Sequence, residues 1–228
     1  MPERKAVVVH SGGMDSTTLL METIRGGMYA EVFSFGVNYG QKHARRELDC
    51  AARICADLQI GRVVADLRAA ASCFMGSALT GLGAVPEGHY KHESMKATVV
   101  NNRNMVILSL AAAFAQSVGA MAVYYGAHAG DHAIYPDCRK EFYSSCAVTI
   151  GYATDDAVRL FAPYGAWNKE RIVRRGELLR VPWSITWSCY NGRERHCGKC
   201  GTCVERREAF QLAGVVDPTE YEGQNGEK

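Results

Sequence analysis

A serine- and glycine-rich segment near the N-terminus has the composition of a phosphate-binding loop. Residues 11–18 are Ser-Gly-Gly-Met-Asp-Ser-Thr-Thr, and they follow a short β-branched run that ends at His10. Glycines let a backbone approach an anion closely, and the first turn of a helix offers unpaired N–H groups and the positive end of a dipole. Asp15 could hold a magnesium ion or orient the loop. The alternative is that Asp15 is an ordinary helix cap. The segment as a whole indicates a site for the phosphates of a nucleotide.

The order of residues separates this loop from two widespread phosphate loops. The segment has no Gly-Lys followed by Ser or Thr, as in a Walker loop, and no Gly-x-Gly-x-x-Gly, as in a dinucleotide site. It resembles the SGGxDS loop of the PP-loop ATP pyrophosphatase superfamily, which grips pyrophosphate while the α-phosphate is attacked. The resemblance implies ATP as the cofactor. It assigns cofactor binding to His10, Ser11, Gly12, Gly13, Met14, Asp15, Ser16, Thr17, Thr18, Leu19 and Leu20.

Four cysteines near the C-terminus have the spacing of a metal site. Cys197, Cys200 and Cys203 follow one another at three-residue intervals, and Cys189 lies a short way upstream. Four thiolates form the tetrahedral ligand set that structural zinc prefers. Free buried thiols and a redox Cys-x-x-Cys pair are the alternatives. We expect a structural zinc ion held by these four cysteines, with the adjacent His196 outside the ligand set.

The elements that must position these motifs alternate between strands and helices. Apolar runs and apolar residues at helical spacing predict strands at 5–10, 31–37, 62–66, 120–126 and 158–162, and helices at 15–25, 41–58, 104–117, 136–152 and 168–180. Residues 68–98 are expected to form a long surface loop, and the tail beyond Asp217 is expected to be frayed. The alternation predicts a doubly wound, mainly parallel, Rossmann-like α/β sheet. We expect residues 1–185 to form the ATP-binding domain and residues 186–228 a small zinc-binding segment packed on it.

The composition limits the classes of function. The 228 residues carry a formal net charge of only +2, which does not favour stable nucleic-acid binding. No apolar run is long enough for a membrane helix, and the N-terminus lacks the features of a secretory signal. The nine cysteines are odd in number, and four crowd near the C-terminus, which favours a reducing compartment with a metal site over a disulfide framework. We therefore expect a cytoplasmic protein.

Several short pieces, in order, are similar to the 7-cyano-7-deazaguanine synthase (QueC) family over nearly the whole chain. They are SGGMDSTT at 11–18, YGQKH at 39–43, GSALT at 76–80, RN at 103–104, YPDCRKEF at 135–142, and WSCYNG followed by HCGKCGTCVER within 187–206. Two positions depart from the family pattern: no proline precedes Arg103 by two residues, and Lys140 replaces the proline after Arg139. These changes affect the local shape of the expected substrate pocket. The resemblance also implies an adenine nucleotide alpha hydrolase-like fold and a homodimer.

The resemblance implies a ligase that converts 7-carboxy-7-deazaguanine and ammonia to 7-cyano-7-deazaguanine through adenylated intermediates, with ATP and Mg²⁺. Carboxylates suit the N–H edge of a deazaguanine, and the planar guanidinium of Arg103 or Arg139 suits its carboxylate. The residues expected to be catalytic are Asp15, Ser16, His43 and Arg103. Those expected to bind the substrate are Tyr39, Gln41, Arg103, Asp131, Asp137, Arg139 and Glu141.

Three other functions remain open at this point. A relative could join the same deazaguanine carboxylate to an amine on a protein or another molecule and stop at the amide. Another PP-loop enzyme could act on tRNA, although such enzymes bring a basic surface or an extra domain. A zinc- and nucleotide-binding module without catalysis is the third. The product's mass and the release of AMP distinguish these alternatives from the synthase.

Overall fold

Five parallel strands form one sheet in the computed structural model, which describes residues 4–223. The strands are β1 (Lys5–Val9), β2 (Glu31–Asn38), β3 (Arg62–Asp66), β4 (Ala122–Tyr124) and β5 (Arg159–Phe161). Their order is β3-β2-β1-β4-β5, and all four neighbouring pairs run parallel. Because the strand order reverses between β1 and β4, this is the point at which a doubly wound sheet binds ligands. The expected α/β fold is confirmed.

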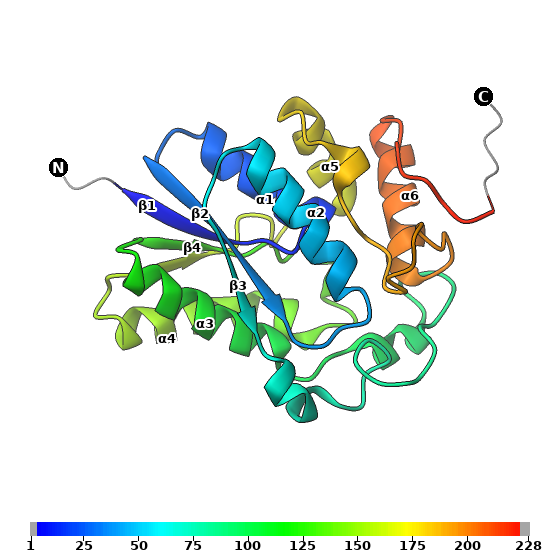
Figure 1. Cartoon of the computed structure of the whole chain (residues 1–228), viewed down its shortest axis with the longest axis horizontal. Helices are drawn as coiled ribbons and strands as arrows, with labels where there is room; N and C mark the ends of the chain where they lie inside the picture. The colour runs from blue at the N-terminus through cyan, green and yellow to red at the C-terminus, as the bar shows by residue number, and fades with distance from the viewer. Residues whose placement is uncertain (1–3, 224–228) are drawn as a thin grey trace.

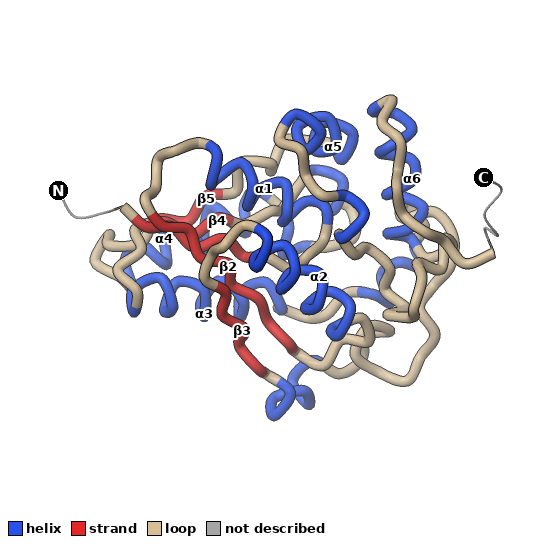
Figure 2. Tube along the Cα trace, turned by 45° about the horizontal axis from the view of Figure 1, so that its top comes forward, coloured by secondary structure: helices blue, strands red, loops and turns tan. Residues whose placement is uncertain are grey.

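Helices cover both faces of the sheet (Figures 1 and 2). The helices are α1 (Met14–Arg25), α2 (Ala44–Asp57), α3 (Arg103–Ser117), α4 (Lys140–Ala153), α5 (Lys169–Leu178) and α6 (Gly201–Ala213). Figure 1 shows α1 and α2 on one side of the sheet and α3 and α4 on the other, while α5 and α6 lie beyond α1. This arrangement results from right-handed crossovers on either side of β1.

Two expectations about local structure were wrong, and one helix was not predicted. Residues 201–213, within the expected zinc-binding segment, form α6. The helix expected at 136–152 begins at Lys140, because Arg139 is extended after a short 3₁₀ turn at Pro136–Cys138. The tail is not frayed up to residue 223, since Tyr221 is 3% exposed and pairs with His196. The rest of that tail, residues 224–228, lies outside the described residues.

The expected loop at 68–98 contains no strand and no α-helix, only two 3₁₀ segments at Arg68–Phe74 and Glu93–Thr98. Its middle lies against the cysteine segment: Gly88 N–H donates to the carbonyl oxygen of Lys199 over 2.8 Å. Residue Gly201, at the start of α6, is covered by Met95 and Tyr90. The long loop and the cysteine segment therefore support each other.

The interior of the sheet is apolar and includes the C-terminal cysteines. Ala6, Val7 and Val8 of β1 are fully buried. The four C-terminal cysteines and Trp187 belong to the same buried cluster as Val7 and the apolar face of α3. The cysteine segment therefore shares a core with the sheet, and the division at residue 185 stays a prediction.

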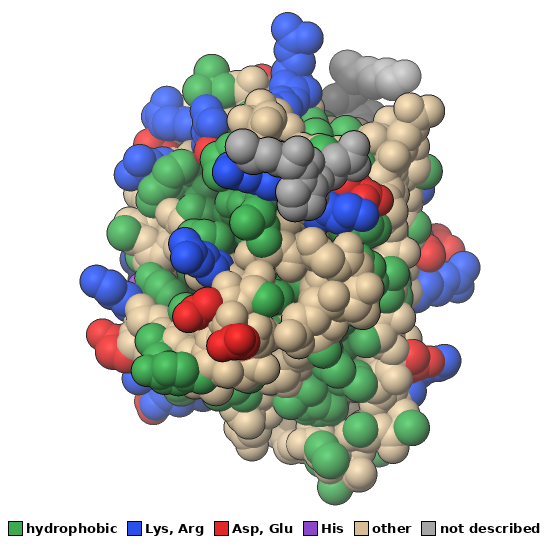
Figure 3. All heavy atoms as spheres, turned by 90° about the vertical axis from the view of Figure 1, so that its left-hand side faces the viewer, with side chains coloured by type: hydrophobic (Ala, Val, Ile, Leu, Met, Phe, Trp, Pro, Cys, Tyr) green, Lys and Arg blue, Asp and Glu red, His purple; other side chains and the backbone are tan. Residues whose placement is uncertain are grey.

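Charged and apolar side chains are mixed on the surface. On the face drawn in Figure 3, hydrophobic side chains lie among lysines, arginines and carboxylates. Among residues 4–223, no helix has both the length and the apolar character needed to cross a bilayer.

Candidate active site

The loop between β1 and α1 packs tightly against α2. Gly12 has a φ of +90°, and a Cβ on this residue would lie 2.5 Å from the carbonyl oxygen of Glu47. Only glycine suits both the left-handed conformation and the lack of space. Gly13 caps α1, and its N–H donates to Ser11 Oγ over 3.3 Å. The loop is thereby fixed at the carboxyl edge of the sheet, next to the N-terminus of α1.

A cavity of about 230 Å³ lies beside this loop at the point where the strand order reverses. Segments that follow β1, β2 and β4 contribute to its wall, as does the start of α3. The residues assigned from the sequence that line the cavity are His10, Ser11, Gly13, Met14, Asp15, Ser16, Tyr39, Gln41, His43, Arg103 and Asp131. The structure thus brings the phosphate loop and much of the expected substrate set to one cavity.

Part of the assigned phosphate-binding stretch faces the protein interior instead. Leu19 and Leu20 are buried in an apolar cluster with Ile54, because α1 turns them towards α2. Thr18 Oγ1 donates to the carbonyl oxygen of Met14 over 2.8 Å, and Thr17 Oγ1 lies 3.1 Å from His10 Nε2. Gly12 lies against α2, as described above. Of residues 10–20, the cavity is therefore lined only by 10, 11 and 13–16.

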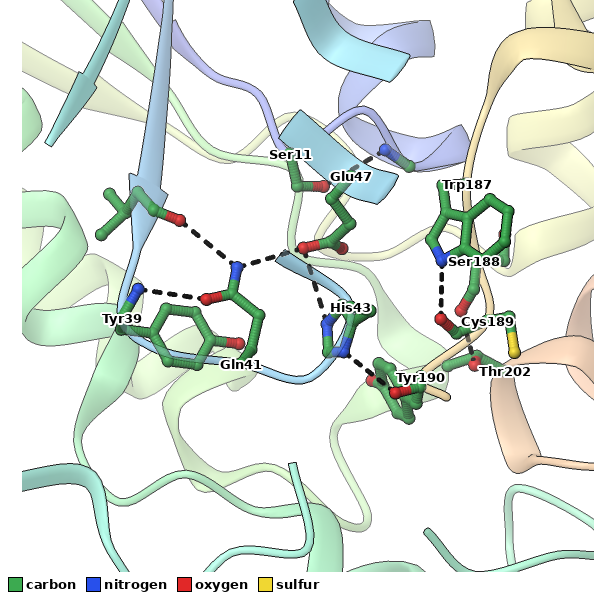
Figure 4. Close-up of polar contacts among 12 residues, drawn as sticks. Ser11, Tyr39, Gln41, His43, Glu47, Trp187, Ser188, Cys189, Tyr190 and Thr202 are labelled. Atoms are coloured by element: carbon green, nitrogen blue, oxygen red, sulfur yellow. Dashed lines mark hydrogen bonds and ion pairs between the residues drawn. The ribbon is translucent and has the colours of Figure 1, made fainter. Parts of the chain in front are cut away.

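One wall of the cavity is a network around Gln41 and His43 (Figure 4). Gln41 Oε1 accepts from Tyr39 N–H over 3.0 Å, and Gln41 Nε2 donates to Glu47 Oε2 over 3.3 Å. His43 Nδ1 lies 3.2 Å from the carbonyl oxygen of Tyr190, to which a neutral ring donates its hydrogen. Burial lowers the pKa of His43, and the carboxylate of Glu47 opposes this. These side chains hold one another in place and shape the wall.

Arg103 presents a guanidinium to the cavity from the first residue of α3. Its Nη1 donates to the Tyr39 hydroxyl over 3.3 Å, and the guanidinium lies 5.7 Å from the centre of the Tyr39 ring. Among residues 4–223, no carboxylate oxygen lies within 4.0 Å of the Arg103 guanidinium, so this group has no ion-pair partner there. The preceding Asn102 has a φ of +55°, which asparagine tolerates better than most residues. Asn102 thus supplies the turn in a stretch that lacks the family's proline.

Three residues assigned to the substrate do not line the cavity. Asp137 Oδ2 accepts from the backbone N–H of Asn104 over 3.1 Å, so this carboxylate anchors the start of α3. Arg139 is exposed, and its Nε donates to the carbonyl oxygen of His132 over 2.9 Å. Glu141 is exposed in the first turn of α4. Of the three candidate carboxylates, only Asp131 reaches the cavity.

A charged cluster beside Asp15 was missed in the sequence. Lys169 Nζ lies 3.3 Å from Asp15 Oδ2 and 2.6 Å from Glu205 Oε2, and His128 Nε2 lies 3.3 Å from Asp131 Oδ2. His128 Nδ1 accepts from Gly130 N–H over 3.1 Å, which turns Nε2 towards the carboxylates. Asp15 Oδ1 is buried without a hydrogen-bond partner. Three carboxylates thus surround one ammonium group.

Position after a strand was the signal that could have identified two of these residues. His128 follows β4, and Lys169 begins the helix that follows β5, at the same edge of the sheet as the phosphate loop. Glu205 lies on α6, and no pattern in the sequence indicates its position.

The four C-terminal cysteines form a compact buried group. Their sulfur atoms all lie within 4.8 Å of one another. Backbone N–H groups point at the sulfurs: Cys197 N–H donates to Cys189 Sγ and Cys200 N–H to Cys197 Sγ, each over 3.3 Å. Hydrogen bonding with Cys189 lowers the pKa of Cys200 and raises that of Cys203, because thiolates this close cannot all ionise without a cation. The donor set therefore fits a metal such as zinc.

His196, the histidine next to this group, makes its contacts with Ser188 and Trp187. His196 Nε2 accepts from Ser188 N–H over 3.1 Å, and its ring centre lies 4.1 Å from that of Trp187. Trp187 and Trp183 are both buried, and Trp187 also lines the cavity.

Comparison with known proteins identifies the family. A family model described as queuosine biosynthesis protein QueC matches residues 5–214. The chain belongs to the QueC family. The chain is 51% identical to the 7-cyano-7-deazaguanine synthase of Hahella chejuensis over 218 residues, which is 96% of this chain and 93% of that protein. It is 50% identical to 7-cyano-7-deazaguanine synthase 1 of Colwellia psychrerythraea, covering 96% and 99% of the two chains.

A solved structure shows how far the fold of this QueC family member is shared. The NMN synthetase from Francisella tularensis matches with a TM-score of 0.53 and 15% identity, covering 94% of this chain and 79% of that one. At this identity the likeness concerns the fold alone.

Proposed function

We propose that this chain is an ATP-dependent 7-cyano-7-deazaguanine synthase, a ligase that forms C–N bonds. The observation that carries the proposal is about 50% identity to proteins with that name across nearly all of both chains. The cavity supports it, because a phosphate loop at one part of the wall and the Arg103 guanidinium at another suit ATP and a carboxylate substrate.

The proposed reaction uses two activations. The substrate carboxylate oxygen attacks the α-phosphorus of ATP and pyrophosphate leaves; ammonia then displaces AMP and gives the amide. The amide oxygen attacks a second ATP, again releasing pyrophosphate. Loss of AMP, which carries that oxygen, and of two protons from nitrogen leaves the nitrile. The protein's contribution is to position these groups and to stabilise phosphate charge.

The residues around the phosphate loop suit distinct parts of this work. Hydroxyls of Ser11 and Ser16 and the N-terminus of α1 would bind phosphate oxygens, and the Lys169 ammonium would add a positive charge. Arg103 would bind the substrate carboxylate, and Asp131 would accept from the N–H edge of the base. Each assignment is supported by the presence of these residues along one cavity.

Mg²⁺ and zinc are proposed as the metals. Asp15 has a buried, unpartnered Oδ1 in the first turn of α1, so Asp15 suits Mg²⁺, which would neutralise phosphate charge. The cysteine group suits zinc in a structural role, because four thiolates close its coordination shell.

The cellular setting is also proposed. The nine cysteines are all free, which suits the reducing cytoplasm. The substrates are small molecules, and the homodimer remains a prediction that light scattering of the purified protein tests.

Mass spectrometry tests the proposed function. The protein is incubated with ATP, Mg²⁺, ammonium and 7-carboxy-7-deazaguanine. The masses of the small-molecule products and of the intact protein are then measured. We expect the nitrile together with AMP and pyrophosphate. Accumulation of the amide as the final product, or a mass added to the protein, would contradict the synthase assignment.

A further inference from the structure

We propose that Glu205 is a positioning residue that holds the Lys169 ammonium beside Asp15 of the phosphate loop, so that the cysteine segment orders the ATP site. The inference rests on the proposed function only in taking this cavity as the binding site for ATP. It assigns a role to a side chain on α6 that does not line the cavity.

The contact between Glu205 and Lys169 is short and buried. Glu205 Oε2 accepts from Lys169 Nζ over 2.6 Å, and the two side chains are only 7% and 13% exposed. Asp15 Oδ2 lies further from the same nitrogen, at 3.3 Å, and makes an ion pair but no hydrogen bond. A buried carboxylate is tolerated when it is paired, and its partner is then held in one geometry. Glu205 is therefore the group that fixes where the ammonium lies.

The charges around Lys169 explain why a third carboxylate is useful. Asp15 and Glu205 pair with the ammonium, Asp131 adds a further negative charge nearby, and His128 lies beside Asp131. Burial lowers the pKa of Lys169, but the carboxylates outweigh burial and raise it. Without Glu205, the ammonium could turn fully towards Asp15, and it would then neutralise the carboxylate of the phosphate loop. With Glu205, Lys169 stays between α6 and the loop and lines the cavity.

The cysteine group lies at the start of the helix that carries Glu205. Cys200 is the N-cap residue of α6, Cys203 lies in its first turn, and Glu205 follows two residues later. Thr202 Oγ1 donates to the carbonyl oxygen of Ser188 over 2.7 Å, which ties the start of α6 to the segment before the cysteines.

The same segment also contacts the phosphate loop directly. The N–H of Trp187 donates to the carbonyl oxygen of Gly12 over 2.9 Å. Thus two sets of contacts connect the cysteine segment to the phosphate loop. One is the backbone hydrogen bond of Trp187, and the other runs from Glu205 through Lys169 to Asp15.

A metal held by His128, Asp131 and Glu205 is a different explanation for the cluster. It is disfavoured because the Glu205 carboxylate already pairs with the Lys169 ammonium over 2.6 Å, which places a positive charge where the metal would have to lie.

ATP binding by calorimetry, without the deazaguanine, tests the proposal. Glu205→Gln is compared with Glu208→Gln, which changes a carboxylate one turn along α6 that pairs with His89 instead. We expect Glu205→Gln to weaken ATP binding about tenfold, the usual scale of one charge-assisted contact, and Glu208→Gln to leave it unchanged. Metal per chain, measured by elemental mass spectrometry, should stay equal in both variants. Equal ATP affinities of the two variants would overturn the proposal.

A double-mutant cycle shows whether Glu205 acts through Lys169. In a Lys169→Gln background, adding Glu205→Gln should leave ATP affinity unchanged, because the group it positions is gone. A further tenfold loss in that background would show that Glu205 acts by another route. If a glutamine variant fails to fold, Lys169→Met is compared with the double variant Lys169→Met and Glu205→Leu, in which apolar groups replace the buried pair, and their ATP affinities should be equal. The calorimetry measures ATP binding without the deazaguanine substrate. A failure to form the nitrile would therefore refute the proposed function but would leave the test of Glu205 valid.

Discussion

At the residue scale, we propose Arg103 as the group that binds the substrate carboxylate. Its guanidinium lies in the cavity, is braced by the Tyr39 ring and hydroxyl, and has no carboxylate partner among residues 4–223. A positive group without a counter-ion favours an anionic ligand, and a planar guanidinium matches a carboxylate through two parallel hydrogen bonds. Arg139, the other candidate from the sequence, is exposed and donates to a backbone carbonyl.

Paired substitutions decide between the two arginines. Arg103→Lys keeps the charge but loses the bidentate geometry and the contact with Tyr39. We expect it to lower kcat/KM for 7-carboxy-7-deazaguanine by about 10- to 100-fold, the scale of one to two charge-assisted hydrogen bonds, with little change in ATP binding. Arg139→Lys should change kcat/KM less than twofold. Steady-state kinetics with each variant measures both effects, and the reverse ranking would assign the carboxylate to Arg139.

At the scale of elements, α6 depends on the cysteine group at its N-terminus. Cys200 caps the helix, and the fully buried Arg206 on the same helix donates to Thr186 Oγ1 over 2.8 Å and pairs with Asp217. A metal bound at the cysteines would therefore stabilise the helix that carries Glu205 as well as the surrounding segment.

Cys200→Ser tests that dependence. A hydroxyl is a poor ligand where three thiolates remain, so we expect bound metal to fall well below one per chain and the melting temperature to drop by at least several degrees. Cys146→Ser, a buried thiol far along the sequence from the cluster, is the control. Elemental analysis and thermal unfolding measure the two effects. A metal-free Cys200→Ser protein with an unchanged melting temperature would show that the metal has no structural role.

Elements and site residues were predictable where the residues that define them lie within a few positions of one another in the sequence. The segment 11–18 and the three cysteines at 197–203 each carry their chemistry within a few residues, so their positions were clear before the structure. The strands and crossover helices followed from apolar spacing. The helix α6 was hidden because its first turn consists of Gly201, Thr202 and Cys203, which read as part of a metal motif.

Groups that meet only in the folded chain were not predictable in the same way. Lys169, His128 and Glu205 come from three separate segments and converge beside Asp15. Conversely, Asp137, Arg139 and Glu141 lie close in sequence to expected site residues, but the turn at Pro136–Cys138 and the start of α4 direct them away from the cavity. Leu19 and Leu20 face the core because helical periodicity turns them inward.

At the scale of the whole molecule, buried histidine links stability to pH. His10 is fully buried, between Ser34 Oγ at 3.0 Å and Thr17 Oγ1 at 3.1 Å. Burial, with a smaller effect of Arg62, lowers its pKa from 6.5 to about 3. The folded pKa is thus below the unfolded pKa, so the unfolded chain binds a proton first. The stabilising contribution is complete above about pH 6.5 and is lost as the pH falls towards 3.

His10→Asn should reduce this sensitivity to acid. Asparagine keeps a donor and an acceptor but does not titrate. Between pH 6 and 4, the free energy of unfolding of the natural chain should fall more steeply than that of the variant, by up to about 1.4 kcal/mol per pH unit for one proton. Urea unfolding at several pH values measures the slopes. Parallel slopes for the two proteins would mean that His10 is protonated alike in the folded and unfolded chains.

The hydrogen bond from Trp187 to Gly12 joins the first loop of the chain to its last fifth. On the ribosome, the SGGMDSTT segment emerges long before its two supports, Trp187 and the helix that carries Glu205. Long-range contacts of this kind form late, because nearly the whole chain must be ordered first. A partly synthesised chain therefore has the residues of the proposed ATP site but not their arrangement. With ATP bound at this loop as proposed, ATP consumption would be confined to chains that have been made and folded through to their C-terminal helix.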